Sequence, residues 1–293
     1  MRQGLQALLG HFGYRVARIE PHPTPPGPQL LRRVAPSADP IWPLPRRNDK
    51  MTDDQIRAEF AKYDAWHYAY TFEGGLSFPV RTSHPGPLTG ASDRHLRRYR
   101  HFMPYLLQAH KGSLRGKRIL DIACNSGFWS VQCALLGAEV VGFDARPELV
   151  DQANLIKSIV GVENVEFRLL DFWDMTADTL GGQFDIVLNL GILYHLPAPL
   201  EALRLTAAMA RDSILLDTEI YRSPEAAIQL RWEEPLSIRS ANRSGIVALP
   251  SKQALELMLR DLGAQEWFEI PLHLSDMPSD YTYHHRASWL IKM

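Results

Sequence analysis

The stretch that most constrains the fold of this chain is residues 118–144, RILDIACNSGFWSVQCALLGAEVVGFD. An apolar run, a loop of small residues (123–127), a helix-like segment and a second apolar run ending in Asp144 follow one another. This order predicts strand, tight turn, helix and strand, the start of an open α/β sheet. The helix N-terminus there offers unpaired N–H groups, and a carboxylate after the second strand can bind both hydroxyls of a ribose. The stretch therefore predicts a nucleoside site.

The loop also restricts the class of nucleoside. A dinucleotide fingerprint needs G-x-G-x-x-G, and a phosphate-binding loop needs a Lys-Ser/Thr pair. Here Gly127 is the one glycine of the loop, and no such pair follows. An acid followed by a short small-residue loop resembles the first motif of class I S-adenosylmethionine (SAM) methyltransferases, whose cofactor carries no phosphate. Ala123 and Asn125 stand where that family commonly has glycine. Asn125 can adopt a left-handed backbone, and we expect a negative φ at Ala123.

The rest of the core alternates strands and helices. We expect strands at 118–122, 139–143, 165–169, 184–190 and 213–217, a helix from about 144 to 160 and another at 251–262, and an antiparallel pair at 266–270 and 287–291. This order predicts a Rossmann-like, doubly wound, mainly parallel sheet of seven strands, and the resemblance implies an antiparallel last strand. We therefore predict an α/β fold with an N-terminal helical and extended segment.

The N-terminal part divides into two regions by composition. Residues 1–50 combine a short amphipathic helix with a proline-rich connector, because the proline density at 21–45 excludes helices and central strands. The helix is expected to pack on the protein itself or on a dimer mate, with a membrane surface as the alternative. Residues 51–115 form a helical and aromatic cap, with helices at 52–63 and 92–107. Residues 116–293 form the SAM-binding domain, with a substrate insertion at about 219–250.

Bulk composition bounds the partners and the compartment. The net charge of −1 gives no long-range attraction to nucleic acid. Cys124 and Cys133 have neither metal-site nor disulfide spacing, which favours a cytoplasmic location, and we expect Cys124 to pack as a small buried residue. No apolar stretch reaches the ~20 residues of a membrane span. His284 and His285 are adjacent at the entry of a strand and would point to opposite faces, so we expect no metal site there.

The resemblance assigns cofactor contacts to individual residues. It implies that Asp144 binds the ribose, with a helix cap as the alternative role, and that Asp171 meets the adenine amino group, with a surface turn as the alternative. Phe172 or Trp173 could stack on the adenine face. The loop after the fourth strand matches the family's segment beside the methionine and the methyl group, and Asp121 and Gly127 would lie at the methionine amino end. The full set of implied cofactor residues is Asp121, Ala123, Asn125, Gly127, Asp144, Asp171, Phe172, Asn189 and Gly191.

The acceptor site is predicted from residues outside the cofactor loop. A hydroxyl acceptor must lose a proton, and His195 is our first candidate base because a neutral imidazole titrates near the working pH. A loop histidine bonded to backbone is the alternative. Glu219, after the fifth strand, could instead act as base or bind the substrate. An aromatic set with polar tips suits a ring or a sugar face, or forms a hydrophobic cap. The predicted substrate residues are Trp66, His67, Tyr68, Tyr194 and Tyr221.

Three features resemble the wobble-uridine tRNA methyltransferase-like group more closely than other class I enzymes. They are a Trp-His/Tyr-rich segment before the core, the D-I-x-C-N-x-G-F loop and the Leu-Tyr-His-Leu segment after the fourth strand. No Lys-Gly-Pro-Phe-like segment is present, so plain SAM is expected rather than a carboxylated form. The run DRHLRRYRH at 93–101 could line up arginines against phosphates or form a solvated helix face. O-methylation of a small hydroxylated metabolite or sugar-containing intermediate is our leading hypothesis, with tRNA methylation and noncatalytic SAM binding as alternatives.

Overall fold

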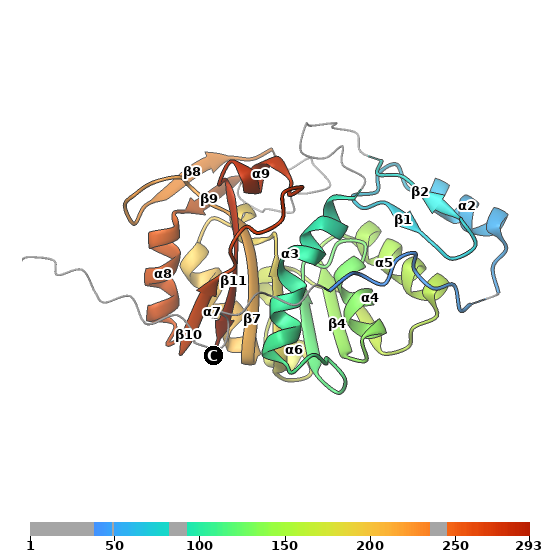
Figure 1. Cartoon of the computed structure of the whole chain (residues 1–293), viewed down its shortest axis with the longest axis horizontal. Helices are drawn as coiled ribbons and strands as arrows, with labels where there is room; N and C mark the ends of the chain where they lie inside the picture. Colours follow the sequence, from blue (N-terminus) through green and yellow to red (C-terminus); the bar gives the residue numbers. More distant parts are fainter. Residues whose placement is uncertain (1–37, 49, 82–92, 235–244) are drawn as a thin grey trace, which may run out of the picture.

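A seven-stranded sheet forms the centre of the computed structural model, which describes residues 38–48, 50–81, 93–234 and 245–293 (Figure 1). Its strands lie in the order β10-β11-β7-β6-β3-β4-β5. The strands are β3 (Arg118–Ile122), β4 (Glu139–Asp144), β5 (Val165–Leu169), β6 (Phe184–Leu190), β7 (Ala210–Glu219), β10 (Glu266–Glu269) and β11 (Arg286–Lys292). The five strands from β3 to β7 are parallel, and β11 lies antiparallel between β7 and β10. The predicted fold class is confirmed.

The strand order reverses beside β3. The chain runs outward from β3 through β4 to β5, then returns to place β6 on the other side of β3. In open α/β sheets, ligands bind outside the carboxyl ends of the strands at such a reversal. The topology therefore predicts a ligand site at the loops that follow β3, β4, β5 and β6.

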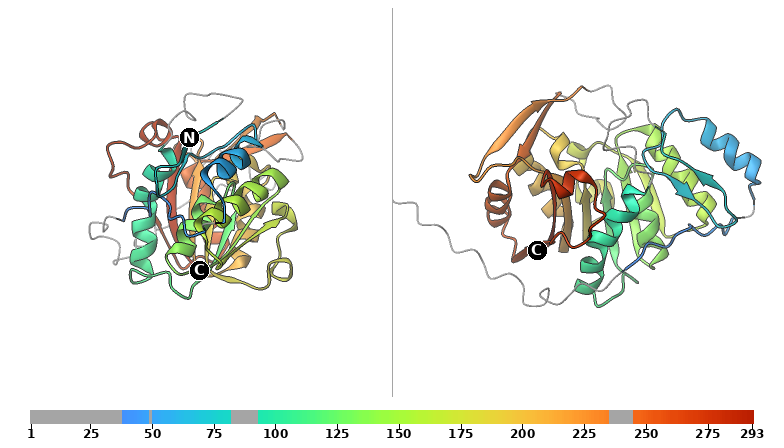
Figure 2. Two further views of the ribbon diagram at one scale, coloured as in Figure 1. Left: turned by 90° about the vertical axis from the view of Figure 1, so that its right-hand side faces the viewer. Right: turned by 45° about the horizontal axis from the view of Figure 1, so that its top comes forward.

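Helices cover both faces of the sheet (Figures 1 and 2). Successive side chains of a strand point to opposite faces, so Ile119 joins one hydrophobic cluster and Leu120 the other. The first cluster is completed by α3 (Arg94–Ala109), α4 (Phe128–Leu135) and α5 (Pro147–Val160), and the second by α6 (Ala177–Leu180), α7 (Pro199–Met209) and α8 (Lys252–Asp261). Two short 3₁₀ turns, η2 (Phe172–Asp174) and η3 (Leu193–His195), follow β5 and β6.

The boundaries of these elements follow local signals. Pro147 opens α5 at its first position, and Gly161 ends it in a left-handed conformation. Three strands have the predicted bounds, whereas β4 is one residue longer and β7 extends to 210–219. Among the added β7 residues, Thr218 and Glu219 pair with β11 and Ala210 pairs with β6, so their strand conformation depends on partners from distant sequence.

The segments before the core pack against its α4 side. The helix α2 (Asp53–Ala61) begins at a capping box formed by Thr52 and Gln55. A small sheet follows, β1 (Tyr70–Thr71) with β2 (Ser77–Phe78). The described part of the proline-rich connector is tied to α4, because Ile41 exchanges two hydrogen bonds of 2.9 Å with the Gln132 side chain. The amphipathic helix predicted near the N-terminus lies outside the described residues.

The predicted insertion contains a hairpin, β8 (Ile228–Trp232) with β9 (Ile246–Pro250). In Figures 1 and 2 it lies over the same end of the sheet as the short helix α9 (Ser279–Thr282). The hairpin is attached to the loop after β6, since Ala248 N–H donates to the Leu196 carbonyl at 3.0 Å. Residues 235–244 of the insertion lie outside the described ranges.

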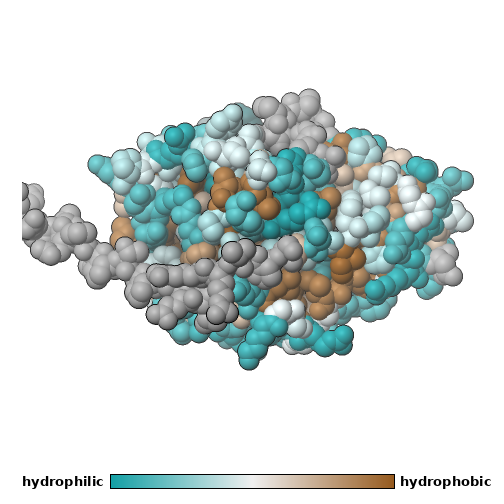
Figure 3. All heavy atoms as spheres, in the orientation of Figure 1, coloured by the Kyte–Doolittle hydropathy of each residue, from teal (hydrophilic) through white to brown (hydrophobic). Residues whose placement is uncertain are grey.

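The described surface and helices have the character of a folded domain. Figure 3 shows hydrophilic residues over most of one face, with smaller hydrophobic areas between them, as is usual for a folded domain. Within the described ranges, no helix combines the length and the apolar character needed to cross a bilayer.

Candidate active site

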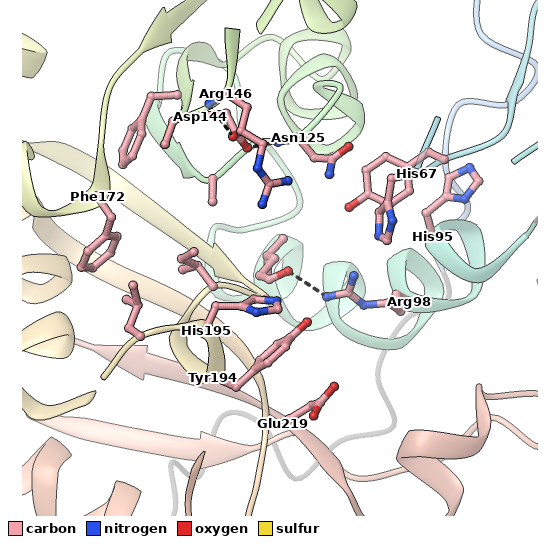
Figure 4. Close-up of a pocket in the computed structure, with 18 of the residues that line it drawn as sticks. His67, His95, Arg98, Asn125, Asp144, Arg146, Phe172, Tyr194, His195 and Glu219 are labelled. Carbon is pink, nitrogen blue, oxygen red and sulfur yellow. Dashed lines mark hydrogen bonds between the residues drawn. The ribbon is translucent and has the colours of Figure 1, made fainter. Parts of the chain in front are cut away.

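A cavity opens at the carboxyl ends of the parallel strands (Figure 4). Its lining includes residues from the loops after β3, β4, β5 and β6 and from the end of β7. Residues from before the core, from α3 and from β11 also line it. Of the predicted site residues, those that line the cavity are His67, Tyr68, Ala123, Asn125, Asp144, Asp171, Phe172, Gly191, Tyr194, His195 and Glu219.

The loop after β3 has three left-handed residues within five positions. The φ angles of Ala123, Asn125 and Gly127 are 52°, 53° and 80°. Asn125 therefore adopts the predicted conformation, and its Oδ1 accepts from the Ser126 N–H at 2.7 Å. The expected negative φ at Ala123 is wrong, and a left-handed alanine costs roughly 1–2 kcal/mol. The surrounding contacts hold this strained turn beside the cavity, a place where proteins often keep backbone strain.

Gly127 is required by a close approach of neighbouring elements. A Cβ atom at this position would lie 2.7 Å from Phe167 Cζ and 3.0 Å from Ala153 Cβ. Gly127 starts α4 beneath the loop and does not line the cavity. Its role in this structure is to let the loop pack against β5 and α5.

Asp144 links the loop after β3 to the turn before α5 through two hydrogen bonds from backbone N–H groups. Its Oδ2 accepts from the Asn125 N–H at 3.1 Å, and its Oδ1 accepts from the Arg146 N–H at 3.2 Å. Burial raises the pKa of this carboxyl group, while the nearby Arg146 charge and the backbone N–H groups act in the opposite direction. The N-cap position of α5 is Arg146, without a side-chain cap, so Asp144 organises the turn before the helix and keeps a face toward the cavity.

Asp121 lies below the cavity, in the protein interior. It is 1% exposed and accepts a 2.6 Å hydrogen bond from the Ser130 hydroxyl. Burial raises its pKa to about 7, although the bonds from Ser130 oppose that shift. The placement of Asp121 at the methionine amino end stays a prediction, because its side chain does not line the cavity.

Both cysteines are free and buried. Burial raises the pKa of the Cys124 thiol well above its ordinary value, so the thiol is protonated at neutral pH. This agrees with the packing role predicted for Cys124. A reducing, cytoplasmic compartment stays a prediction.

The loop after β5 presents an aromatic wall. Asp171 caps η2 by accepting from the Trp173 N–H at 2.9 Å, and it also lines the cavity. Phe172 is buried against the second hydrophobic cluster with one side on the cavity, whereas Trp173 packs edge-to-face against it. Both aromatic residues considered for the adenine face line the cavity, and Phe172 is the more buried of the two.

His195 is held by a carboxylate that the sequence reasoning missed. Its Nδ1 lies 2.7 Å and 2.8 Å from the two carboxylate oxygens of Glu233, just beyond β8. The alternative of a histidine bonded to backbone is therefore wrong for this side chain. Neighbouring Tyr194 lies under the guanidinium of Arg286, 4.8 Å from ring centroid to Cζ.

The floor of the cavity is a buried ion-pair network. Asp217 Oδ1 accepts from Arg98 Nη2 at 2.7 Å and from Arg286 Nη1 at 2.8 Å, and Ser288 Oγ donates to Oδ2 at 2.7 Å. Burial alone would raise the pKa of Asp217, but Arg98 and Arg286 hold it well below its ordinary value. Arg98 also donates to the carbonyl of Leu190 at the end of β6. No spacing in the sequence could reveal this network, whose members come from α3, β7 and β11.

The arginines of α3 are engaged within the protein. Arg94 forms an ion pair with Asp280, Arg97 pairs with Asp93 and donates to the Asp276 carbonyl, and Arg100 pairs with Asp39. With Arg98 on Asp217, each of these guanidinium groups faces an acid of the chain itself, which weighs against the predicted phosphate-contact line.

Three other predicted residues lie away from the cavity. Trp66, 1% exposed, stacks on Phe60 and donates its Nε1–H to the Phe60 carbonyl, so its predicted contact with the acceptor is wrong. Tyr221 does not line the cavity and its N–H donates to the Pro250 carbonyl. Asn189 is buried behind the loop, where its Nδ2 donates to Thr206. His95 and Arg146 line the cavity although sequence reasoning did not select them.

Comparisons with known proteins agree with the fold. A family model described as a methyltransferase domain matches residues 113–245. Among curated relatives, a ubiquinone biosynthesis O-methyltransferase of Bordetella parapertussis is 35% identical over 105 residues, which cover 36% of this chain and 43% of the relative. A tRNA U34 carboxymethyltransferase of Alcanivorax borkumensis is 32% identical over 157 residues, 53% of this chain and 47% of the relative. The chain thus spans less than half the length of these two relatives.

A solved structure shares the fold over most of the chain. The N-terminal domain of EvdMO1, crystallised in the presence of S-adenosylhomocysteine (SAH) and D-fucose, superposes with a TM-score of 0.64 at 22% identity, covering 84% of this chain and 98% of that one. The seven-stranded order of this fold, the small-residue loop after β3 and Asp144 at the end of β4 all lie within or beside the stretch that matches the methyltransferase domain model. The residues present fit SAM, because a carboxylate, an aromatic face and a tight loop meet at one cavity.

Proposed function

We propose that this chain O-methylates a small hydroxylated metabolite or a sugar-containing intermediate. The observation that carries the proposal is that His195 opens into the same cavity as Asp144 and Phe172. His195 Nδ1 is bound to Glu233, whereas Nε2 makes no hydrogen bond with a described residue. When bound, SAM supplies an electrophilic methyl group, so the protein's tasks are to align the acceptor, exclude water and accept a proton.

The cofactor half of the cavity lies toward the loops after β3, β4 and β5. We assign Asp144 to the ribose hydroxyls, and Asp171 with Phe172 to the adenine. Figure 4 shows Tyr194, His195 and Glu219 close together on another side of the cavity, and His67 beside His95. Together with Tyr68, which also lines the cavity, these side chains offer ring faces and polar tips to an acceptor. Glu219 already accepts from Arg286 at 3.3 Å, which favours His195 over Glu219 as the base.

A small acceptor is supported by the charges around the cavity. Arg94, Arg98 and Arg286 face it, but each one pairs with an acid of the chain. The whole chain has a net charge of −1. Both facts limit the positive field available to a polyanion, and Arg146 in the cavity lining contributes one charge to that field.

Methylation of tRNA is the second candidate. It is favoured by the similarity to tRNA U34 carboxymethyltransferases, which covers about half of this chain and about half of those relatives. The internal pairing of the α3 arginines weighs against it.

A binding and transfer assay tests the proposal. Calorimetry with SAH should give heat, and methyl-tritiated SAM should label an acceptor from a panel of catechols, hydroxybenzoates and monosaccharides. His195→Gln should lower kcat about 10²–10⁴-fold while SAH still binds, the range typical of general bases. His273→Gln, which changes a histidine outside the cavity lining, is the matched control and should keep full activity.

The same assay separates the alternatives. Labelling of bulk tRNA, lost in the double variant Arg97→Glu with Arg100→Glu and at raised salt, would favour the RNA function. Heat with SAH but no labelling of any acceptor class would favour a noncatalytic SAM-binding protein. Absence of heat at millimolar SAH would contradict the cofactor assignment itself.

A further inference from the structure

The contact between His195 and Glu233 joins two parts of the chain that no local pattern connects. His195 belongs to η3 after β6, and Glu233 follows β8 in the insertion, 38 residues later. Their side chains are only 11% and 26% exposed. A carboxylate that holds one nitrogen of an imidazole determines which nitrogen carries the proton.

Resting on the proposed function, we propose that Glu233 is a positioning residue that fixes His195 as the Nδ1–H tautomer and so leaves Nε2 as the proton acceptor in the cavity. Both oxygens of Glu233 lie within hydrogen-bond distance of Nδ1. An ionised carboxylate can only accept, so Nδ1 must be the donor. The lone pair of the neutral ring is then on Nε2, which no described residue engages.

The proposed step balances with this arrangement. The acceptor oxygen forms a bond to the methyl carbon as the S–CH₃ bond breaks and its electron pair goes to sulfur, while the acceptor's proton moves to His195 Nε2. The resulting imidazolium faces the Glu233 carboxylate, which stabilises the new positive charge. A hydroxyl acceptor of the proposed function needs this device because its proton must leave as the oxygen is methylated, whereas a group already ionised has no proton to lose.

Glu233 is held in place independently of His195. Its N–H donates to the Gly245 carbonyl at 2.8 Å, and the preceding Trp232 pairs with Ile246 in the hairpin register. The hairpin is attached to the η3 loop by the bond from Ala248 to Leu196. Loss of the Glu233 side chain should therefore change the tautomer of the His195 imidazole without detaching the hairpin from the η3 loop.

Nuclear magnetic resonance of histidine-labelled protein tests the inference directly. Long-range ¹⁵N–¹H spectra of the full chain with SAH should show His195, assigned from the His195→Gln spectrum, protonated at Nδ1 and bare at Nε2. Glu233→Ala should shift the ring toward the Nε2–H form. Glu233→Gln should keep the Nδ1–H form, because its amide oxygen still accepts, but without the negative charge. Glu234→Gln is the matched control, since that exposed carboxylate accepts from Trp232 Nε1 instead.

Kinetics with an acceptor from the panel gives a second readout. Glu233→Ala should lower kcat about 10–100-fold with little change in KM, as expected for a partner that orients the base. Glu233→Gln should lie between Glu233→Ala and the wild type, and Glu234→Gln should match the wild type.

The outcomes separate this inference from the proposed function. A wild-type His195 protonated at Nε2, or an unchanged tautomer in Glu233→Ala, overturns the inference even if methyl transfer is detected. An unchanged kcat in Glu233→Ala overturns it as well. The expected tautomers without transfer to any acceptor support the positioning role of Glu233 and count against the O-methyltransferase proposal alone.

Discussion

Replacing Gly127 by alanine would test whether the cofactor loop depends on a close packing of backbone against side chains. Alanine must adopt φ near 80°, which costs roughly 1–2 kcal/mol. The new methyl group would also lie 2.7 Å from Phe167 Cζ and 3.0 Å from Ala153 Cβ. Because the interior there is close-packed, relief of this overlap adds about 1–3 kcal/mol. The sum is about 2–5 kcal/mol of lost stability.

Gly181→Ala is the matched control for the backbone cost. Gly181 has a φ of 75°, and a Cβ there would have no atom within 4 Å. It should lose only the conformational part, about 1–2 kcal/mol. The difference between the two variants isolates the overlap, which we expect to be about 1–3 kcal/mol in urea unfolding followed by circular dichroism.

The affinity for SAH tests whether the same substitution also disturbs the cofactor site. The loop that Gly127 ends also supplies the Asn125 N–H to Asp144, so a displaced loop should weaken SAH about tenfold in calorimetry. Gly181→Ala should bind SAH as the wild type does. Equal unfolding free energies for the two variants would refute the packing argument, and an unchanged SAH affinity in Gly127→Ala would refute the link to the cofactor.

Three further predictions concern buried or cavity-facing carboxylates. Burial raises the pKa of Asp121 to about 7, so its contribution to the free energy of unfolding is fully present below about pH 4 and is lost as the pH rises to 7. Asp121→Asn should therefore flatten the plot of the urea midpoint against pH between pH 5 and 8. A plot as steep as that of the wild type would contradict this. Asp217→Asn should cost about 3–5 kcal/mol, because it leaves the buried Arg98 without a charged partner and removes one of the three acids that pair with Arg286; a loss below 1 kcal/mol in urea unfolding would count against that network. Asp144→Ala should weaken SAH at least tenfold in calorimetry, whereas Glu148→Ala, which changes an exposed acid in the first turn of α5, should not.

The core elements could be predicted because their signals are local. Short apolar runs placed β3, β5 and β6 at their observed bounds, and Pro147 with Gly161 marked the ends of α5. The antiparallel pair of β10 and β11 was also expected, since both strands are short apolar runs. Each of these signals lies within a few residues of the element that it specifies.

The cavity lining was predicted in part for the same reason. Asp144, Asp171 and His195 end strands or open the next loops, and parallel strands bring such positions to one edge of a sheet. Trp66 was misplaced because an aromatic residue looks the same in sequence whether it packs in a core or lines a cavity. Its burial on Phe60 depends on the fold of α2 and the segment after it.

The amino-acid sequence by itself thus determined the sheet, its helices and the cofactor-side loops, since the apolar periodicity and the turn residues act over short range. The tertiary structure alone decided the pairings of charge. Arg98 meets Asp217 across 119 residues, and His195 meets Glu233 across 38. From the sequence, an arginine within a helical pattern is interpreted as a solvated side chain. Only the fold shows that a buried carboxylate lies next to it. The physical reason is that burial and charge pairing depend on elements that are close in space and distant along the chain.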